Sequence, residues 1–232
     1  MPSVPERAYF PILVSIKNQL CCVIGGGRVS YRKVTSLLQA GATVKVISPE
    51  TVAELDQLAN TGQIILEKRN YQPGDLTGCR LAFAATNQQE VNEACRLEST
   101  ESGILLNVVD VPDLCDFIMP AVHQQGDLLF MVCSQGKSPM LSKRIRKELE
   151  KSYGPSYGWV SHILGEIRLQ AFEDLPDIRQ RKALFTHLIE EGPLDEALEL
   201  NEEEARAVLW EAFHKKVGTL QGTKKTRQDV DE

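Results

Sequence analysis

Three consecutive glycines at positions 25 to 27 stand between an apolar run and a helical pattern, and this arrangement constrains the fold more than any other part of the chain. The apolar run, Leu20–Ile24, is typical of a parallel strand that is buried on both faces. From Val29 onward, apolar residues repeat at helical spacing until Gly41, a helix stop signal, and residues 43 to 48 have a strand pattern again. We therefore predict a strand–helix–strand unit with the glycines in its sharp turn.

The glycine turn matches most of the G-x-G-x-x-G fingerprint of dinucleotide-binding Rossmann folds. In that fingerprint Gly25 permits the sharp turn, Gly27 lets the backbone approach a pyrophosphate, and Ser30 holds the third position with a small side chain in place of glycine. The anion would lie at the amino end of the Val29 helix, where free N–H groups and the helix dipole attract negative charge. A purely structural turn is the alternative, but the strand–helix–strand setting favours cofactor binding.

The second predicted strand ends in Ser48, where dinucleotide-binding folds usually carry an acidic residue that binds the adenine ribose. Pro49 and Glu50 come next. Either the displaced Glu50 carboxylate or the backbone at Pro49 takes this role, so we expect both residues to contact the cofactor and NAD to be favoured over NADP.

Strand patterns recur at residues 63–67, 80–86 and 104–109, with a helical pattern at 90–100. This alternation predicts an α/β fold, a Rossmann-like and mainly parallel sheet. After Pro112 the order changes, because residues 116–120 and 128–134 are two strand-like runs with no helix between them. They predict a small hairpin-like β layer.

The remainder of the chain has helical patterns. Ser138 and Pro139 form a helix start, as N-cap and first-turn residue. Further helices are expected at 159–172, 178–190, 194–200 and 205–216, followed by a loose polar tail. We predict a NAD-binding domain at 1–112, a small α+β dimerisation domain at 113–152, a helical domain at 153–218 and a flexible tail at 219–232.

Polar residues follow two of the predicted parallel strands, at the edge where open α/β sheets bind ligands. Asp110 could position or accept a proton while hydride leaves a substrate, or it could merely cap the turn before Pro112. Thr86 and Asn87 could contact the cofactor or cap the next helix. Asn107 belongs to the same segment as Asp110, and we include it among the substrate contacts.

A glycine, a cation and a helix start coincide at Ser134, Lys137 and Ser138, a combination suited to an anionic ligand. A simple turn with a solvated lysine is the alternative. We include these three residues among the substrate contacts.

Composition narrows the class of partner. The net charge of -6 argues against nucleic-acid binding, and no apolar run is long enough to span a membrane. The six cysteines form no CxxC pair, so we expect buried reduced thiols in a cytoplasmic protein with no metal site of its own. The expected partner is a small molecule.

Three segments together resemble the precorrin-2 dehydrogenase family, Rossmann enzymes of siroheme synthesis that also form the amino-terminal part of siroheme synthases. They are VxGGGxVxxRK from Val23, NVVDxPxxxxFxxPA from Asn107 and GKSPxLxxxxRxxLE from Gly136. The resemblance covers residues 9 to 150. Ser30 replaces the family's usual alanine, and the turn from Ser134 to Lys137 also departs from its usual sequence.

The resemblance implies oxidation of precorrin-2, a carboxylate-rimmed tetrapyrrole, to sirohydrochlorin with NAD⁺ as hydride acceptor. It implies that Asp110 lies at the reaction centre and that the chain forms a homodimer through the β layer and the Ser138 helix. Iron insertion into sirohydrochlorin is left open, because only some family members perform it. The implied cofactor contacts are Gly25, Gly26, Gly27, Arg28 and Val29 at the phosphates and Pro49 and Glu50 at the adenosine.

A non-catalytic dinucleotide-sensing module is the competing interpretation. It would use the same glycine turn but would need neither Asp110 nor the cationic segment that begins at Lys137. A different NAD-dependent dehydrogenase has less support, because the sequence contains no evident Tyr-x-x-x-Lys pair or zinc-ligand set.

Overall fold

The structure, a computed structural model, describes residues 9 to 228. The chain divides into two compact units, the first ending at Met119 and the second beginning at Pro120. Among the described residues, no helix combines the length and apolarity needed to cross a membrane.

The first unit contains a five-stranded parallel sheet in the order β3-β2-β1-β4-β5. Its strands are β1 (Leu20–Ile24), β2 (Thr43–Ile47), β3 (Ile65–Glu67), β4 (Leu81–Ala84) and β5 (Leu105–Val108), and its helices are α1 (Arg28–Gln39), α2 (Ala53–Asn60), α3 (Gln89–Ser102) and the short 3-10 helix η1 (Pro112–Leu114). The strand order reverses between β1 and β4, and such a switch point opens a ligand crevice at the carboxyl ends of the strands. The predicted Rossmann-like fold is confirmed.

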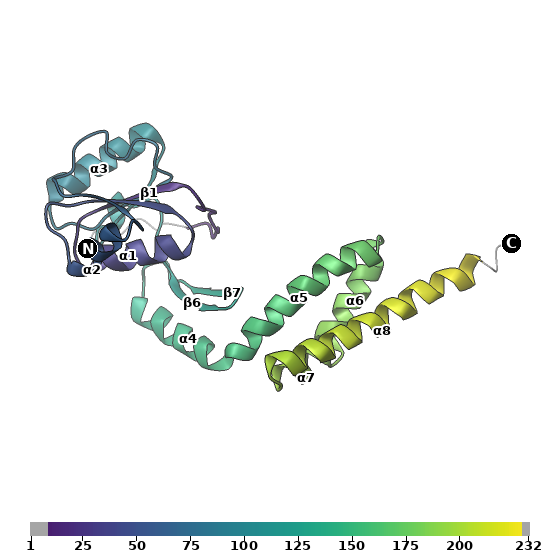
Figure 1. Ribbon diagram of the computed structural model, residues 1–232. Coiled ribbons are helices and arrows are strands. Elements are labelled where there is room, and N and C mark those ends of the chain that lie inside the picture. The colour runs from purple at the N-terminus through teal and green to yellow at the C-terminus, as the bar shows by residue number, and fades with distance from the viewer. Residues whose placement is uncertain (1–8, 229–232) are drawn as a thin grey trace. The chain divides into compact units, whose positions relative to one another are not determined.

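Two hydrophobic clusters cover the two faces of this sheet. Val34 and Leu37 of α1 pack with Phe83 of β4 on one face. Cys95 of α3 packs with Leu106 of β5 on the other. Figure 1 shows α1 and α3 on opposite sides of the strands. The central strands are therefore buried on both sides, as their continuous apolar runs predict.

The strand predicted at residues 116–120 is wrong. The Asp116 carboxylate instead accepts a hydrogen bond from the Leu106 N–H at 3.0 Å, and the Phe117 carbonyl accepts one from the Asn107 amide at 2.9 Å. These bonds tie the segment to β5. Pro120 also lacks the N–H that a ladder requires, so strand pairing begins only at the next residue.

The second unit begins with an antiparallel hairpin of β6 (Ala121–Gln125) and β7 (Leu128–Val132). Helix α4 (Pro139–Ser152) packs against both strands. The predicted cap is confirmed, because the Ser138 hydroxyl accepts a hydrogen bond from the Leu141 N–H at 3.4 Å. The predicted β layer is thus present, with its first strand displaced toward the carboxyl terminus.

Four helices complete the second unit around a core of their own. They are α5 (Pro155–Asp174), α6 (Ile178–Glu190), α7 (Pro193–Leu198) and α8 (Glu202–Gln228). Ile163, Leu184, Leu209 and Phe213 are fully buried where these helices meet.

The loose tail predicted from residue 219 is wrong as far as residue 228, because α8 continues through it. The Gln180 amide donates to the Leu220 carbonyl at 2.9 Å, and the Gln221 amide donates to the Asp174 carbonyl at 3.1 Å. Buried Val217 extends the apolar stripe of the helix. Residues 229–232 lie outside the described part.

The expected buried reduced thiols are confirmed at Cys21, Cys22, Cys79 and Cys95, whereas Cys133 is exposed. Burial raises the pKa of Cys21 to about 11 and that of Cys95 to about 12. These two thiols therefore stay protonated and unreactive at neutral pH.

Candidate functional site

The turn between β1 and α1 requires glycine at two positions. Gly25 has a φ of +114°, and a Cβ atom there would lie 2.3 Å from the Ala85 carbonyl oxygen. At Gly26 a Cβ atom would lie 2.0 Å from the Glu50 carbonyl oxygen. The glycines thus let the turn fit between the ends of β2 and β4.

Gly27 is different, since a Cβ atom there would meet no atom within 4 Å. Gly27 is the N-cap of α1 and has no side chain with which to cap the helix. The first N–H groups of a helix have no partner within it, so they can bind an anion. An open backbone at this point fits the close approach of a pyrophosphate.

Ser30 occupies the third fingerprint position. Its side chain is fully buried, and its Oγ lies 3.3 Å from the place where a Gly25 Cβ would be. Its hydroxyl has no hydrogen-bond partner among the described residues. Ser30 therefore acts as a small packing residue beneath the turn.

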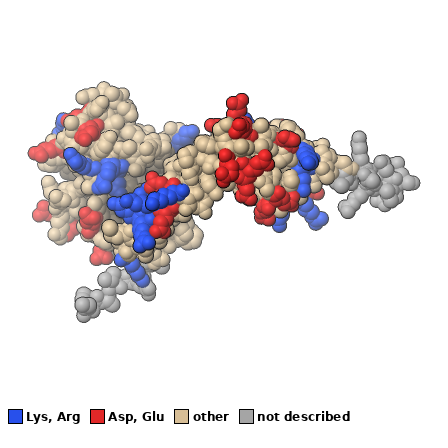
Figure 2. All heavy atoms as spheres, turned by 90° about the horizontal axis from the view of Figure 1, so that it is seen from below, with Lys and Arg blue, Asp and Glu red and all other residues tan. Residues whose placement is uncertain are grey.

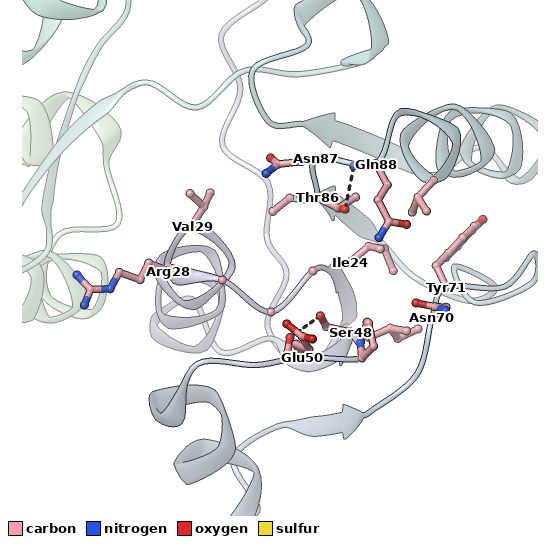
Figure 3. Close-up of a pocket in the computed structure, with 17 residues that line it drawn as sticks. Ile24, Arg28, Val29, Ser48, Glu50, Asn70, Tyr71, Thr86, Asn87 and Gln88 are labelled. Carbon is pink, nitrogen blue, oxygen red and sulfur yellow. Dashed lines mark hydrogen bonds between the residues drawn. The ribbon is translucent and has the colours of Figure 1, made fainter.

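A cavity of about 620 Å³ opens above this turn, within the range of about 300–1,000 Å³ that ligand pockets occupy. Figure 3 shows Ser48 and Glu50 on one side of it, Thr86 and Gln88 on the other, and Arg28 extending away from it. The cavity brings together all nine residues expected to bind the cofactor: Gly25, Gly26, Gly27, Arg28, Val29, Pro49, Glu50, Thr86 and Asn87. Residues that sequence reasoning missed also line it: Ile24, Ile47, Ser48, Asn70, Tyr71, Ala85, Gln88 and Val91.

The segment after β2 is fastened to the glycine turn. The Ser48 hydroxyl donates to the Glu50 carbonyl oxygen at 2.6 Å, and the Val52 N–H donates to the Gly26 carbonyl oxygen at 2.8 Å. Ser48 is buried, whereas Glu50 is exposed and lines the cavity. The carboxylate displaced from the usual position is therefore at the same edge of the sheet as the turn.

Thr86 and Asn87 follow β4 and line the cavity opposite Glu50. The Thr86 hydroxyl accepts a hydrogen bond from the Gln88 N–H at 3.2 Å. The Asn92 amide donates to the Thr86 carbonyl oxygen at 3.3 Å. Thr86 thus shapes the turn into α3 while it also faces the cavity.

A second cavity of about 560 Å³ adjoins the first, and Asp110 lines it. The two cavities share Val29, Ala85, Thr86 and Asn87. Asp110 follows β5 with a φ of +61°, a left-handed conformation that is uncommon for a residue with a side chain and often marks a functional site. Asp110 is exposed, so its carboxylate is accessible from the cavity.

Lys33 lies close to this second cavity, one helical turn after Val29. Its ammonium stands over the Phe83 ring at 5.3 Å from the centroid. Burial lowers the pKa of Lys33, while the nearby Cys115 and Asp110 act in the opposite direction. The surroundings of Asp110 therefore include a partly desolvated cation.

The other predicted substrate residues lie outside both cavities. Asn107 is buried, and its amide is engaged by the Phe117 carbonyl. Ser134 and Ser138 meet in the turn before α4, where the Ser138 N–H donates to the Ser134 Oγ at 2.9 Å, and the Lys137 N–H closes the same turn on the Ser134 carbonyl at 3.0 Å. Their contact with substrate stays a prediction.

Among the described residues, no group of three or more His, Cys, Asp or Glu side chains is arranged to hold a metal ion.

The parallel sheet, the glycine turn and the cavity at the switch point define a Rossmann-type dinucleotide-binding domain. The family described as "Putative NAD(P)-binding" matches residues 12–121. This is the cofactor class that the glycine turn predicts.

Curated relatives extend the match over most of the chain. The siroheme synthase of Methylococcus capsulatus is 35% identical over 204 residues, which are 88% of this chain and 43% of that protein. The siroheme synthase of Chromobacterium violaceum is 37% identical over 199 residues, 86% of this chain and 42% of that protein. The chain is similar to the matched part of these siroheme synthases, and it spans less than half of their length.

A solved structure described as "SirC, precorrin-2 dehydrogenase" matches with a TM-score of 0.74 and 23% identity. The match covers 89% of this chain and 100% of that one. It confirms the predicted fold across both the sheet and the carboxyl-terminal helices.

Proposed function

We propose that this chain is a NAD-dependent dehydrogenase that oxidises precorrin-2 to sirohydrochlorin in siroheme synthesis. The observation that carries the proposal is the joining of the two cavities along Val29, Thr86 and Asn87. A dinucleotide held on the glycine turn would extend toward the cavity that Asp110 lines. The identity of the substrate is inferred from the siroheme synthase relatives and the precorrin-2 dehydrogenase neighbour.

The first cavity suits the cofactor. Gly27 leaves room for the pyrophosphate, and the N–H groups of Arg28 and Val29 at the start of α1 favour its charge. The Glu50 carboxylate would accept hydrogen bonds from the ribose hydroxyls and repel the extra phosphate of NADP. Bound NAD⁺ supplies the hydride acceptor.

Asp110 is the proposed catalytic residue. The oxidation removes a hydride and a proton from the substrate, and the Asp110 carboxylate would accept the proton as the hydride leaves. The proton then passes to water, so that each sirohydrochlorin is formed with one NADH. Lys33 adds positive charge near this carboxylate.

Substrate contacts are proposed at Asn107, Ser134, Lys137 and Ser138. A carboxylate-rimmed tetrapyrrole requires local cations on an acidic protein. In α4, however, Arg144 and Arg146 each form an ion pair with a glutamate one turn later, at 3.0 and 2.9 Å. Figure 2 shows Lys and Arg side chains with acidic side chains beside them. Both arginines are thus already paired within their own helix.

We also propose a homodimer formed through the β6–β7 hairpin. Val122 pairs across the hairpin with Met131, and Leu129 lies on the same face. These three side chains are 40%, 43% and 42% exposed. A second copy of this apolar face is the proposed cover.

The reducing cytoplasm is the proposed compartment. Four of the six cysteines are buried as free thiols, a state that fits a reducing environment.

The test of the proposed function is turnover of precorrin-2 with NAD⁺ in oxygen-free buffer, followed by the absorbance of sirohydrochlorin and of NADH. We expect equal amounts of the two products. NAD⁺ binding without turnover by the folded protein would support the dinucleotide-sensing module instead. Adding Fe²⁺ to sirohydrochlorin with the protein separately tests iron insertion, and a rate equal to the uncatalysed one would exclude it.

A further inference from the structure

The first unit buries an acidic side chain among apolar residues. Glu98 of α3 is only 9% exposed, and its neighbours Cys95 and Leu76 belong to the hydrophobic cluster on that face of the sheet. One carboxylate oxygen accepts a hydrogen bond from the Leu76 N–H at 2.8 Å, and the other accepts one from the Tyr71 hydroxyl. A buried carboxylate is costly unless it is hydrogen-bonded in this way.

Both partners of Glu98 lie in the irregular segment between β3 and β4, residues 68–80. Arg69 holds the start of the same segment, because its guanidinium bonds both Asp75 oxygens at 2.7 Å. The segment is therefore fixed by two independent sets of bonds, one to α3 and one within itself. An irregular segment held this firmly presents a preformed surface.

That surface is one wall of the cofactor cavity. Asn70 and Tyr71 both line the first cavity, and neither lines the second. Figure 3 shows the Tyr71 hydroxyl directed away from the cavity, as its bond to Glu98 of α3 requires, and the Asn70 carboxamide beside Tyr71. Tyr71 thus presents the side of its ring to the cavity, and Asn70 presents its carboxamide to it.

The two cavities determine in which direction the bound dinucleotide would lie. Its pyrophosphate would lie over Gly27, and its reactive end would point toward Asp110 in the second cavity. The opposite end must then lie in the part of the first cavity that the second does not share. That part is bounded by Asn70, Tyr71 and Glu50.

We propose that Asn70 and Tyr71 form the adenine-binding wall of this cavity and that Glu98 is the positioning residue that holds Tyr71 in place. The proposal rests on NAD⁺ binding as proposed above. A carboxamide offers a donor and an acceptor together, which match the acceptor nitrogen and donor amino group of an adenine edge. The flat side of Tyr71 offers apolar surface for the base.

The Glu98–Tyr71 bond is suited to a permanent positioning role. Burial and the hydrogen bond to Glu98 raise the pKa of the Tyr71 hydroxyl above its usual value. The hydroxyl therefore stays protonated and keeps donating at any physiological pH.

The test compares NAD⁺ with nicotinamide hypoxanthine dinucleotide, which differs only at the base edge, by calorimetric titration of the full chain. We expect the unaltered protein to prefer NAD⁺ and Asn70→Ala to lose that preference. Tyr71→Ala should weaken both dinucleotides about tenfold, as expected for loss of an aromatic surface beneath a base. Tyr71→Phe and Glu98→Gln remove or weaken the Tyr71–Glu98 hydrogen bond but keep the ring. Both variants should therefore weaken the binding of the two dinucleotides less than Tyr71→Ala does, and they should reduce the preference for NAD⁺.

Two control variants match these changes. Glu101→Gln alters an exposed residue of α3, and Tyr31→Phe alters a partly buried tyrosine that lines neither cavity. Both should bind as the unaltered protein does. If Glu98→Gln fails to fold, Tyr71→Phe by itself tests the role of the Tyr71–Glu98 hydrogen bond.

The outcomes separate this proposal from the proposed function. Failure of the unaltered protein to bind NAD⁺ would overturn the proposed function and this inference with it. Normal NAD⁺ binding that is unchanged in Asn70→Ala and Tyr71→Ala would overturn only the adenine-binding wall. Loss of base preference in Tyr31→Phe or Glu101→Gln would also overturn it, since the preference would then depend on the fold in general.

Discussion

Alanine in place of Gly27 and alanine in place of Gly26 should have opposite consequences, although the two residues are adjacent. At Gly27 a Cβ atom enters open space. The only cost to folding is a less favourable N-cap, about 1 kcal/mol or less. The methyl group would, however, occupy the space that the pyrophosphate needs, so we expect the dissociation constant for NAD⁺ to rise at least about tenfold, or ~1.4 kcal/mol.

At Gly26 the Cβ atom would lie 2.0 Å from the Glu50 carbonyl oxygen and 2.8 Å from the Ser48 Oγ. The segment after β2 would have to move, which breaks the Ser48–Glu50 hydrogen bond and strains the one from Val52 to Gly26. Each bond contributes about 1 kcal/mol, and overpacking costs roughly 1–3 kcal/mol more. We expect Gly26→Ala to lower the free energy of unfolding by about 4 kcal/mol.

Urea unfolding followed by circular dichroism measures the stability of both variants, and calorimetric titration measures their affinity for NAD⁺. A Gly27→Ala protein that binds NAD⁺ normally would show that no pyrophosphate approaches this residue. A Gly26→Ala protein of unchanged stability would refute the tight contact with the segment after β2.

Three further predictions concern other parts of the molecule. Glu50→Ala should reduce the preference for NAD⁺ over NADP⁺ about tenfold in titrations with both cofactors, because the carboxylate no longer repels the extra phosphate; an unchanged preference would assign discrimination elsewhere. The hydrogen bond from Arg69 lowers the pKa of Asp75, so the stability that this pair contributes is present above the ordinary aspartate pKa and is lost as the pH falls through the lowered value. Urea titrations should therefore show Arg69→Met to be less stable than the unaltered protein at neutral pH and the gap to close in acid, whereas a constant gap would contradict this. Leu129→Asp should convert a dimer into monomers in sedimentation experiments, and a protein already monomeric before the change would refute the proposed interface.

The glycine turn that would bind the cofactor could be predicted because the residues that form it are close together in the sequence. Gly25, Gly26 and Gly27 sit in one turn, and the strand and helix around it are visible in the hydrophobic pattern. The residues after β2 and β4 could be placed beside the turn because the carboxyl ends of parallel strands share one edge of a sheet.

The far wall of the cavity could not be predicted in the same way. The Tyr71–Glu98 bond joins residues 27 positions apart, and nothing in the local pattern of α3 indicates that one of its glutamates is buried. Asn70 did carry a usable signal, since it follows the end of β3 at the same sheet edge.

The two fold errors have different physical causes. At residues 116–120 an apolar run looked like a strand, but the Asp116 carboxylate and Pro120 direct the backbone away from pairing. Beyond residue 218 the polar composition suggested a tail, whereas the stripe of Leu209, Phe213 and Val217 already pointed to a longer helix.

The role of Asp110 is tested most directly by measuring NAD⁺ affinity and precorrin-2 turnover in the same preparation of Asp110→Asn. Asp110 lines the second cavity and not the first, so NAD⁺ should bind with unchanged affinity. Formation of sirohydrochlorin and NADH should fall at least about a hundredfold, the lower limit for loss of a general base. Asp113→Asn, which alters another carboxylate of the same cavity, should retain turnover. Full turnover by Asp110→Asn, or loss of NAD⁺ binding in it, would contradict the central claim that this aspartate acts on the substrate beside a separately bound cofactor.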